Sequence, residues 1–476
     1  MPRWSADVER SDIEHAVKLA GLELSDEVDC HVVGQDPILA SPHHLGNGAA
    51  VVRLLTGAAA SELWRLRTGR RQQVVVDARH AAASLRSYVF AHPVGQPAQS
   101  LQDARRAGGA ARVTRIAAAR DGRYVQLHGS FHDGPQVLQE LGLDETAPPE
   151  QIDAAVSQRD AFELEAAFIR RKVCGGVVRS RQEWADHPQG RAIASLPVVS
   201  ITKIGAAPPE PLPRGDRPTA GVRVLDLTRV LAGPTCAKTL AEHGADVLHI
   251  GAPHLEGGGL FEMETGIGKR QAVLDLNVPE QADALCDLIR SADVFSQGYR
   301  LGTLARRGFS PYQVAAQRPG IVYVSENCYG HVGPWSERPG WEQLGQAATG
   351  MAYREGLSAP DGVPRLAPAA VNDYSTGYLA AYGAMTALAR RATEGGSWHV
   401  QVSLSQTCMW YQRLGDDNDL DAADPGNIEP FLAEMDTPDF GRIQYLRPAL
   451  HLSETPPRWD LPPARQGAHA PEWLPR

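Results

Sequence analysis

The stretch from Gly221 to Lys269 constrains the fold of this chain more than any other. Residues 222–227 form a short apolar run with β-branched side chains, typical of a strand buried on both faces. An Ala-Gly-Pro turn at 232–234 follows, and we expect a helix over about residues 235–242 and a second strand over 245–250. Strand, helix and strand in this order predict a parallel sheet with a ligand crevice at the carboxyl end of its first strand.

The turn after the first strand reads TRVLAGP and lacks the GxGxxG pattern of an ordinary dinucleotide site. Further on, Gly266, Gly268, Lys269 and Arg270 form a short basic turn ahead of a strand expected over residues 272–276. A glycine-flanked Lys-Arg pair can anchor phosphate. The local pattern by itself favours a solvated turn, so both interpretations remain at this point.

The chain beyond this unit continues to alternate helices and strands, with a helix over 278–291 and strands over 293–295 and 321–325. This spacing predicts an α/β fold: a doubly wound parallel (Rossmann-like) sheet domain with a second, smaller mixed α/β domain. A Pro-rich segment, AAPPEPLPRGDRP, reads as an extended linker. We therefore expect a first part over residues 1–205 that includes a small-domain-like region, a linker over 206–218, and a large domain with a C-terminal segment over 219–476.

Two segments 326 positions apart are similar without a gap: GAAASELWRLRTGRRQQVVVD at 57–77 and GAMTALARRATEGGSWHVQVS at 383–403. Each reads as an Ala-rich helix, a Gly-containing turn and an alternating strand. The separation is too long for a solenoid period. Duplication or rearrangement explains the repeat better than chance similarity of two Ala-rich helices. Our hypothesis is a fusion in which a first unit supplies the small domain and a second unit supplies the large one.

Composition excludes several classes of function. A formal net charge of −9 leaves no surplus of Lys and Arg to neutralise a nucleic acid. No run of 18 apolar residues predicts a membrane span, and the charged first residues do not resemble a signal peptide. The six cysteines are scattered, and His43 and His44 have no third ligand at useful spacing, so we expect neither disulfides nor a metal. The predicted location is cytoplasmic.

Three motifs in order, DLTRVLAGPTCAKTLAEHGADVLHI, GKRQAVLDLNVPE and ADVFSQGYRLGTLARRGFS, resemble the large domain of family III CoA-transferases (the CaiB/BaiF family). This group contains formyl-CoA transferase, carnitine CoA-transferase and the 2-methylacyl-CoA racemases. The resemblance runs from about Gly221 to the C-terminus. It implies an enzyme that moves coenzyme A between an acyl-CoA thioester and a carboxylic acid, without a metal, as a homodimer. It does not indicate which acyl group or acceptor acid is used.

The resemblance also assigns residues that bind coenzyme A. It implies backbone and side-chain contacts from the turn after the first strand, phosphate contacts from two basic residues, and an aromatic ring on the adenine side. Gly298 stands where relatives often have Asn, which puts one hydrogen bond in doubt. The residues implied are Val230, Leu231, Ala232, Lys269, Tyr299 and Arg306.

The candidate catalytic residue is Glu342, in the motif RPGWEQLGQAATG. An acid in the first turn of a helix is stabilised as an anion by the free N–H groups there. The resemblance implies that family transferases carry an Asp at this place, which attacks the thioester to give a mixed anhydride and then a carboxyl-CoA thioester. Glu is longer by one methylene, so either the backbone compensates or transferase activity is lost.

Two other functions remain open from the sequence. The first is an acyl-CoA racemase or another CoA-thioester enzyme, although this chain has Gly340-Trp341-Glu342 where the racemases resemble one another in a Gly-His-Asp triplet. The second is a catalytically inactive CoA-binding homologue or partner subunit. His331, in the loop before Glu342, is either a base near the thioester or a polar turn residue.

Overall fold

The computed structural model describes residues 7–96, 109–131, 133–255, 261–416, 420 and 423–475. Its largest sheet has seven strands in the order β11-β10-β9-β12-β13-β14-β8. Six are parallel and β8 runs antiparallel at one edge. The order on either side of β9 is that of a doubly wound fold, with the direction reversing between β9 and β12, which confirms the predicted mixed α/β sheet. The strands are β8 (Val199–Gly205), β9 (Arg223–Leu227), β10 (Asp246–Gly251), β11 (Lys269–Val273), β12 (Val294–Gln297), β13 (Val322–Asn327) and β14 (Ser397–Ser403).

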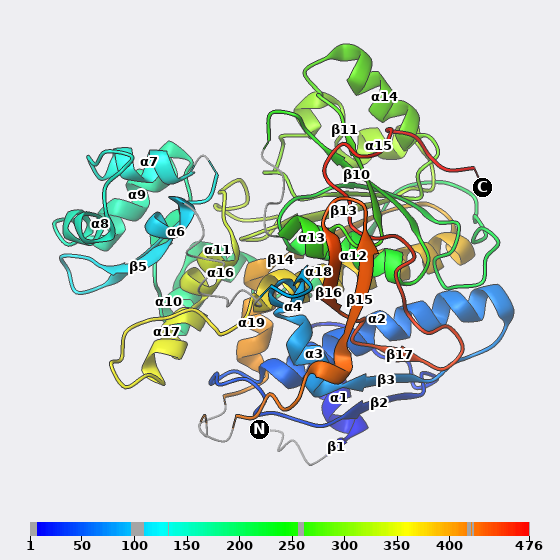
Figure 1. Cartoon of the computed structure of the whole chain (residues 1–476), viewed down its shortest axis with the longest axis horizontal. Coiled ribbons are helices and arrows are strands. Elements are labelled where there is room, and N and C mark those ends of the chain that lie inside the picture. Colours follow the sequence, from blue (N-terminus) through cyan, green and yellow to red (C-terminus); the bar gives the residue numbers. More distant parts are fainter. Residues whose placement is uncertain are drawn as a thin grey trace.

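Helices cover both faces of this sheet (Figure 1). The helix after β9 starts at residue 232 instead of the expected 235, because Gly233 lets its first turn approach Thr228: a Cβ on Gly233 would lie 2.3 Å from Thr228 Cβ. Strand β11 begins at Lys269, so the predicted basic turn before the strand is part of the strand itself. The helices are α12 (Ala232–Glu242), α13 (Glu262–Thr265), α14 (Pro279–Ile289), α15 (Pro311–Gln317) and α18 (Val371–Glu394), with the short η2 (Ala305–Arg307).

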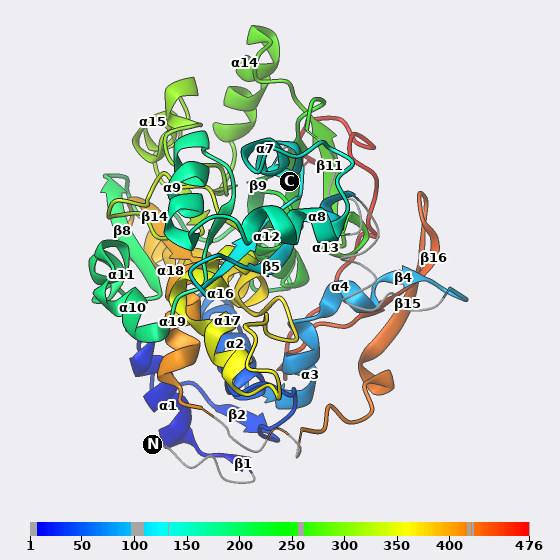
Figure 2. The same cartoon turned by 90° about the vertical axis from the view of Figure 1, so that its left-hand side faces the viewer.

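A smaller region stands to one side of the large sheet (Figures 1 and 2). It contains the antiparallel sheet of β5 (Arg115–Ala118), β6 (Tyr124–Leu127) and β7 (Gly175–Val177). Its helices are α6 (Gly109–Val113), α7 (Asp133–Glu140), α8 (Pro149–Val156) and α9 (Ala161–Arg171), followed by α10 (Arg181–Asp186) and α11 (Pro188–Ile193). Helix α16 (Glu342–Thr349) packs against β6 and β7, and α17 (Met351–Leu357) follows it.

Residues 7–96 and the C-terminal segment form the remaining part. A four-stranded sheet has the order β1 (Asp7–Val8), β2 (Cys30–Val33), β3 (Val74–Asp77) and β17 (His451–Leu452). A second sheet joins β15 (Leu432–Thr437), β16 (Gly441–Leu446) and β4 (His92–Pro93). The helices here are α1 (Arg10–Leu19), α2 (Leu45–Thr68), α3 (Ala78–Ser84), α4 (Ser87–Phe90) and α19 (Leu404–Arg413), with the short η4 (Glu429–Phe431). Residues 1–6, where a signal peptide was not expected, lie outside the described residues.

The sequence repeat corresponds to a repeat of structure. Helices α2 and α18 each span 24 residues, and both their first and last residues are 326 positions apart. The last residues of β3 and β14 are also 326 positions apart, and so are the first residues of α3 and α19. A Cβ on Gly57 would lie 2.5 Å from Val74, and one on Gly383 would lie 2.5 Å from Val400. Because each glycine allows the same close contact of helix and strand, the two segments fold alike.

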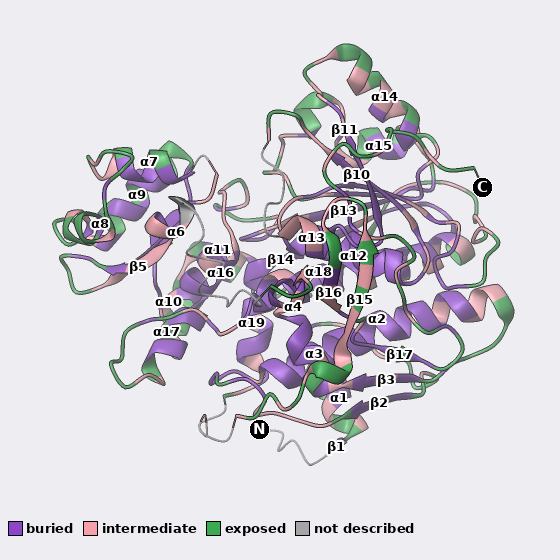
Figure 3. Cartoon of the chain, viewed as in Figure 1, coloured by how far each residue is buried: buried purple, intermediate pink, exposed green. Residues whose placement is uncertain are grey.

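The central helices are the most buried elements of the molecule. Helices α2, α12 and α18 pack together and are largely buried, in contrast to α14 and α15 at the edge (Figure 3). One hydrophobic cluster runs through these helices and includes strand residues of both the four-stranded and the seven-stranded sheet. No helix of the described residues combines the length and apolar character needed to cross a membrane.

Candidate functional site

A cavity of about 430 Å³ lies at the carboxyl ends of β9, β12 and β13. Leu227 at the end of β9, Gly298 after β12 and Glu326 near the end of β13 all line it. The small region contributes Asp133 and Cys174 to its lining. The crevice predicted at the carboxyl end of the first strand is therefore present, at the place where such sheets bind ligands.

The turn between β9 and α12 carries an unusual backbone conformation. Val230 has a φ of 71°, in the left-handed region that β-branched residues rarely adopt. Such a conformation costs about 1–3 kcal/mol and is found mostly where a binding site needs it. Val230, Leu231 and Ala232, the three residues implied to contact coenzyme A, all line the cavity. Helix α12 begins at Ala232, so the turn brings the free N–H groups of its first turn to this wall.

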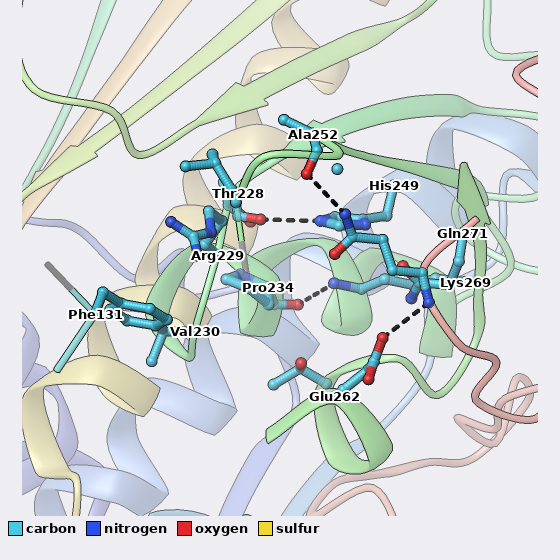
Figure 4. A pocket seen from close by; sticks show the side chains of 14 residues that line it. Phe131, Thr228, Arg229, Val230, Pro234, His249, Ala252, Glu262, Lys269 and Gln271 are labelled. Atoms are coloured by element: carbon cyan, nitrogen blue, oxygen red, sulfur yellow. Dashed lines mark hydrogen bonds between the residues drawn. The ribbon is translucent and has the colours of Figure 1, made fainter. Parts of the chain in front are cut away.

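The arginines at the cavity are not those that the sequence suggested. Tyr299 lines it as expected, but the lining continues with Arg300, while Arg306 is an exposed residue of η2 and is not part of the lining. Arg229 also lines the cavity, and its guanidinium lies 4.7 Å from the centre of the Phe131 ring. This contact ties the turn after β9 to the small region (Figure 4).

Lys269 lines a small pocket beside the cavity, but its charge is already paired. Its Nζ donates to Asp226 at 2.9 Å and to the Pro234 carbonyl at 2.8 Å, and the side chain is 1% exposed (Figure 4). The Lys269 ammonium and burial act in opposite directions on the pKa of Asp226, and that pKa lies below its ordinary value. The arrangement fixes the amino end of α12 against β9 and β11. The phosphate role expected for Lys269 stays a prediction, and a phosphate would have to share an ammonium that is already paired and buried.

Glu342 is buried, and its carboxylate already accepts four hydrogen bonds. Oε1 accepts from Gln346 Nε2 at 2.6 Å and from the backbone N and Nδ2 of Asn372 at 3.2 and 3.0 Å. Oε2 accepts from the backbone N of Asp373 at 2.6 Å. Burial raises the pKa of Glu342, and these hydrogen bonds oppose the rise. Two of the donors are orphan amides of the first turn of α18, so Glu342 acts as a capping group for that helix.

The same capping arrangement occurs in the first copy of the repeat. Asp36 accepts from the backbone N of Gly46 at 3.0 Å and of Asn47 at 2.8 Å, in the first turn of α2. Gly46 and Asn47 precede Asn372 and Asp373 by 326 positions. A carboxylate that holds the start of the long helix is thus a repeated structural feature, and Glu342 fills that role in the second copy.

Asp373 is one of three carboxyl groups that line the cavity, together with Asp133 and Glu326. It lies in the first turn of α18, where its own backbone N–H donates to Glu342, and it lines the cavity wall. Burial raises the pKa of Asp373 well above its ordinary value, and the neighbouring charges of Glu342 and Glu326 add to the rise. Sequence reasoning missed this residue because it begins an Ala-rich helix that reads as core. The signal that could have found it is the polar start, Asn-Asp-Tyr-Ser-Thr, of an otherwise apolar helix.

Glu326 is a third carboxyl group at the cavity. Burial raises its pKa to about 8, and the charge of Asp226 adds to this, while a hydrogen bond from the Gly233 amide lowers it. Within the described parts of the chain its Oε2 is buried and has no hydrogen-bond partner. His331, by contrast, is turned toward β14, with its Nε2 3.0 Å from the Val402 carbonyl, and it is not part of the cavity lining. No cluster of three or more metal-ligating side chains occurs among the described residues.

The doubly wound sheet defines an α/β protein with a cavity at its topological switch point, the place where such folds bind ligands. Residues 219–415 match the model of CoA-transferase family III. The acyl-CoA transferase of Gibberella moniliformis is 32% identical over 403 residues, covering 78% of this chain and 71% of that protein. The acetyl-coenzyme A transferase nodX of Hypoxylon pulicicidum is 33% identical over 328 residues, covering 63% of this chain and 54% of that protein.

Among solved structures, a hypothetical protein of Mycobacterium tuberculosis is 28% identical with a TM-score of 0.39, covering 42% of this chain and 58% of that one. The comparison with the Gibberella protein extends well beyond the segment matched by the family model. The chain belongs to CoA-transferase family III, and the family predicted from the sequence is confirmed.

Proposed function

We propose that this chain transfers coenzyme A from an acyl-CoA thioester to a carboxylic acid, with Asp373 as the attacking carboxylate. The observation that carries the assignment is the position of Asp373 in the lining of the cavity at the carboxyl ends of the strands. Glu342, the residue expected from the sequence to attack, has both oxygens occupied by donors from α16 and α18. In this proposal Glu342 positions Asp373 through the start of α18, and its replacement of Asp no longer counts against activity.

The proposed reaction divides one acyl transfer into steps that each exchange one bond at a carbonyl carbon. An Asp373 carboxylate oxygen attacks the thioester carbonyl, the C–S bond breaks, and CoA leaves as the thiolate. The thiolate then attacks the Asp373 carbonyl of the mixed anhydride, which releases the donor acid and leaves a carboxyl-CoA thioester. The acceptor carboxylate attacks that thioester, and the same two steps in reverse order release the new acyl-CoA and free Asp373.

The pKa values of Asp373 and Glu326 are both raised, and the charge of Glu326 adds to the rise at Asp373. The ionisation of Asp373 therefore depends on which of the two carboxyls holds a proton. Glu342 keeps its charge because four donors surround it. Asp373 lies in the first turn of a 24-residue helix, where the aligned peptide dipoles favour an anion, whereas Glu326 has only the Gly233 amide as a compensating donor. We therefore place the remaining proton on Glu326, which removes one like charge from Asp373 and leaves Asp373 ionised for attack.

The remaining cavity residues fit the binding of coenzyme A. The turn of Val230, Leu231 and Ala232 offers backbone groups to a pantetheine chain, and Tyr299 offers a flat surface. Arg229 and Arg300 carry positive charge at the same wall, as a phosphorylated ligand requires. The free cysteines are consistent with work in a reducing compartment such as the cytoplasm.

Trapping the covalent intermediate tests this function. The protein would be incubated with single acyl-CoA thioesters and hydroxylamine, digested, and its peptides mapped by mass spectrometry. Hydroxylamine converts an acyl-CoA-activated carboxyl to a hydroxamate, so we expect the modification on the peptide carrying Asp373. Modification of Glu342 instead would refute the assignment, and a protein that binds CoA without exchanging it among any acids would refute transfer.

A further inference from the structure

The carboxyl of Glu326 occupies space next to Gly298, which has no side chain. A Cβ on Gly298 would lie 2.5 Å from Glu326 Oε1, so the carboxyl fills the room that any side chain at 298 would need. Gly298 is the residue at which this chain departs from the Asn that relatives often carry. A side chain at 298 would therefore require the Glu326 carboxyl to move away from this wall.

On the basis of the proposed function, we propose that Glu326 takes part as a protonated acid whose hydroxyl donates a hydrogen bond to the carbonyl oxygen of the bound thioester. Its Oε2 is buried and lacks a partner within the described residues, so a ligand can accept from it. The carboxyl lines the same cavity as Asp373, the proposed attacking group. During attack the negative charge that develops on the carbonyl oxygen would meet this donor, which keeps its proton throughout while the C–S bond breaks.

The charges around Glu326 favour its neutral form. Asp226 is a negative neighbour, and the nearby positive Lys269 is already paired with Asp226. Burial raises the pKa of Glu326 to about 8, so the acid is protonated at neutral pH. A neutral acid is an effective donor in an enclosed cavity, where a preorganised hydrogen bond to an oxyanion is stronger than in water. The other titratable groups that line or adjoin the cavity are Asp133, Cys174, Arg229, Cys236, Tyr299, Arg300 and Cys328.

Two substitutions separate the donor from the charge. Glu326→Gln keeps an N–H donor and cannot ionise, whereas Glu326→Ile removes the donor. We expect Glu326→Ile to lower kcat about 100-fold or more, the effect of losing one oxyanion donor, with the Kd for free CoA unchanged. Glu326→Gln should stay within about tenfold of wild type and lose the fall in activity that wild type shows as pH rises through about 8.

The matched control is Glu355→Gln. Burial raises the pKa of Glu355 to about 7, but Glu355 bonds Ser41 and does not line the cavity, so its substitution should leave the pH profile unchanged. Wild-type kcat in Glu326→Ile, or the same alkaline fall in Glu326→Gln, would overturn the inference about Glu326 while leaving transfer by Asp373 intact. Absence of transfer by the wild type would instead overturn the proposed function.

The internal repeat extends to the site and points to a second, independent inference. Asn47 stands 326 positions before Asp373, and its side chain is 1% exposed. Val32 lies opposite Val76 on the neighbouring parallel strand, and Glu326 lies opposite Val402 in the same way. Because Val76 and Val402 are equivalent positions of the repeat, Val32 corresponds to Glu326. The first copy thus repeats the long helix and its capping carboxylate, Asp36, but has an amide and an apolar side chain where the second copy has its two reactive carboxyls.

The two copies also exchange their closing strands. Strand β8, which follows the small region, pairs antiparallel with β14 of the second copy, with Ile201 opposite Val400. Strand β17, near the C-terminus, pairs antiparallel with β3 of the first copy, with Leu452 opposite Val74. Val74 and Val400 are equivalent positions of the repeat. Each copy therefore completes the sheet of the other at the same register.

We infer that the chain is an internal pseudo-dimer, in which two related units interlock by exchanging strands and only the second unit keeps a reactive site. That site needs both units, because Asp133 and Cys174 precede the linker over 206–218 and the other cavity residues follow it. The resemblance led us to expect a homodimer. Strand exchange within one chain completes the sheet of each unit, so no second copy of the chain is required for it.

The oligomeric state and a nicked chain test this inference. Native mass spectrometry and light scattering should give a monomer of 51.3 kDa that binds CoA. A protease site inserted between Pro211 and Leu212 allows the linker to be cut, with the uncut insertion variant as control. We expect both fragments to co-elute and to retain CoA binding. A stable dimer that loses CoA binding on dilution, or fragments that separate without denaturant, would overturn the pseudo-dimer.

Discussion

Paired substitutions at Asp373 and Glu342 separate the attacking carboxylate from the one that holds it in place. Asp373→Asn removes the nucleophile and keeps the size of the side chain. Because Asn47 occupies the equivalent position of the first copy, the fold tolerates an amide there. We expect a change in the free energy of unfolding within about 1 kcal/mol, unchanged CoA binding, and a fall in kcat of at least about 10⁴-fold, as on removal of other covalent nucleophiles.

Glu342→Gln should mainly lower the free energy of unfolding and affect kcat less. The new NH₂ group, placed at Oε2, would face the N–H of Asp373, which now donates at 2.6 Å. Loss of one charge-assisted hydrogen bond costs about 1.5–3 kcal/mol and an unpaired buried donor about 1–3 kcal/mol, partly offset because a buried charge is removed. We expect a net loss of about 2–4 kcal/mol, with kcat reduced less than in Asp373→Asn.

Urea denaturation is the suitable assay for stability. Unfolding entropies near 2.1 cal/mol/K per residue give a melting shift of only about 1 °C per kcal/mol for a chain of this length. The matched control is Asp36→Asn, which removes the capping charge of the first copy and should lower stability similarly without touching the chemical step. A stable but inactive Glu342→Gln beside an active Asp373→Asn would refute the assignment of roles.

Three further predictions concern the cavity and the buried charges. Lys269→Met leaves Asp226 buried without its partner and should destabilise the protein by about 3–5 kcal/mol in urea denaturation, whereas a lower CoA affinity with unchanged stability would restore a phosphate role for Lys269. Arg300→Ala should raise the KM for acyl-CoA several-fold with little change in kcat, because the arginine lines the binding wall; an unchanged KM in steady-state kinetics would contradict this. His243 is buried, and burial lowers its pKa to about 3, with Arg53 and Arg217 adding to the effect. Only the unfolded state then takes up a proton below its ordinary pKa near 6.5, so stability is lost as pH falls from about 6.5 toward 3, by about 1.4 kcal/mol per pH unit within that window. His243→Gln should flatten this slope in urea midpoints measured from pH 7 to 5, and an unchanged slope would exclude His243 as a source of it.

Local sequence patterns were sufficient for the sheet and for one wall of the site. Alternating apolar runs and Gly-Pro turns predict β9, α12 and β10 because a buried parallel strand and its crossover helix have few alternative patterns. The family resemblance pointed to Val230, Leu231 and Ala232, and all three line the cavity. The left-handed backbone of Val230 could not be read from the sequence, because a Val in that conformation is held by the surrounding fold and not by its own preference.

Charged residues were predicted less well than the apolar framework. Lys269 and Glu342 are both conspicuous in the sequence, yet each is paired in the interior, with Asp226 and with the start of α18 respectively. Asp373 is inconspicuous and faces the cavity. Sequence spacing gives the order of acids and bases along the chain, but whether a charge meets a partner or a ligand depends on residues more than 30 positions away.

The sequence by itself determined the parallel sheet, the family, the Pro-rich linker and the 326-residue repeat. Tertiary structure alone decided that Asp373 lines the cavity while Glu342 caps α18, and that β8 and β17 each complete the sheet of the other copy. The physical reason is that strand and helix patterns arise from neighbouring residues, whereas the ionisation of an acid and the pairing of an edge strand depend on the distant segments that pack against them.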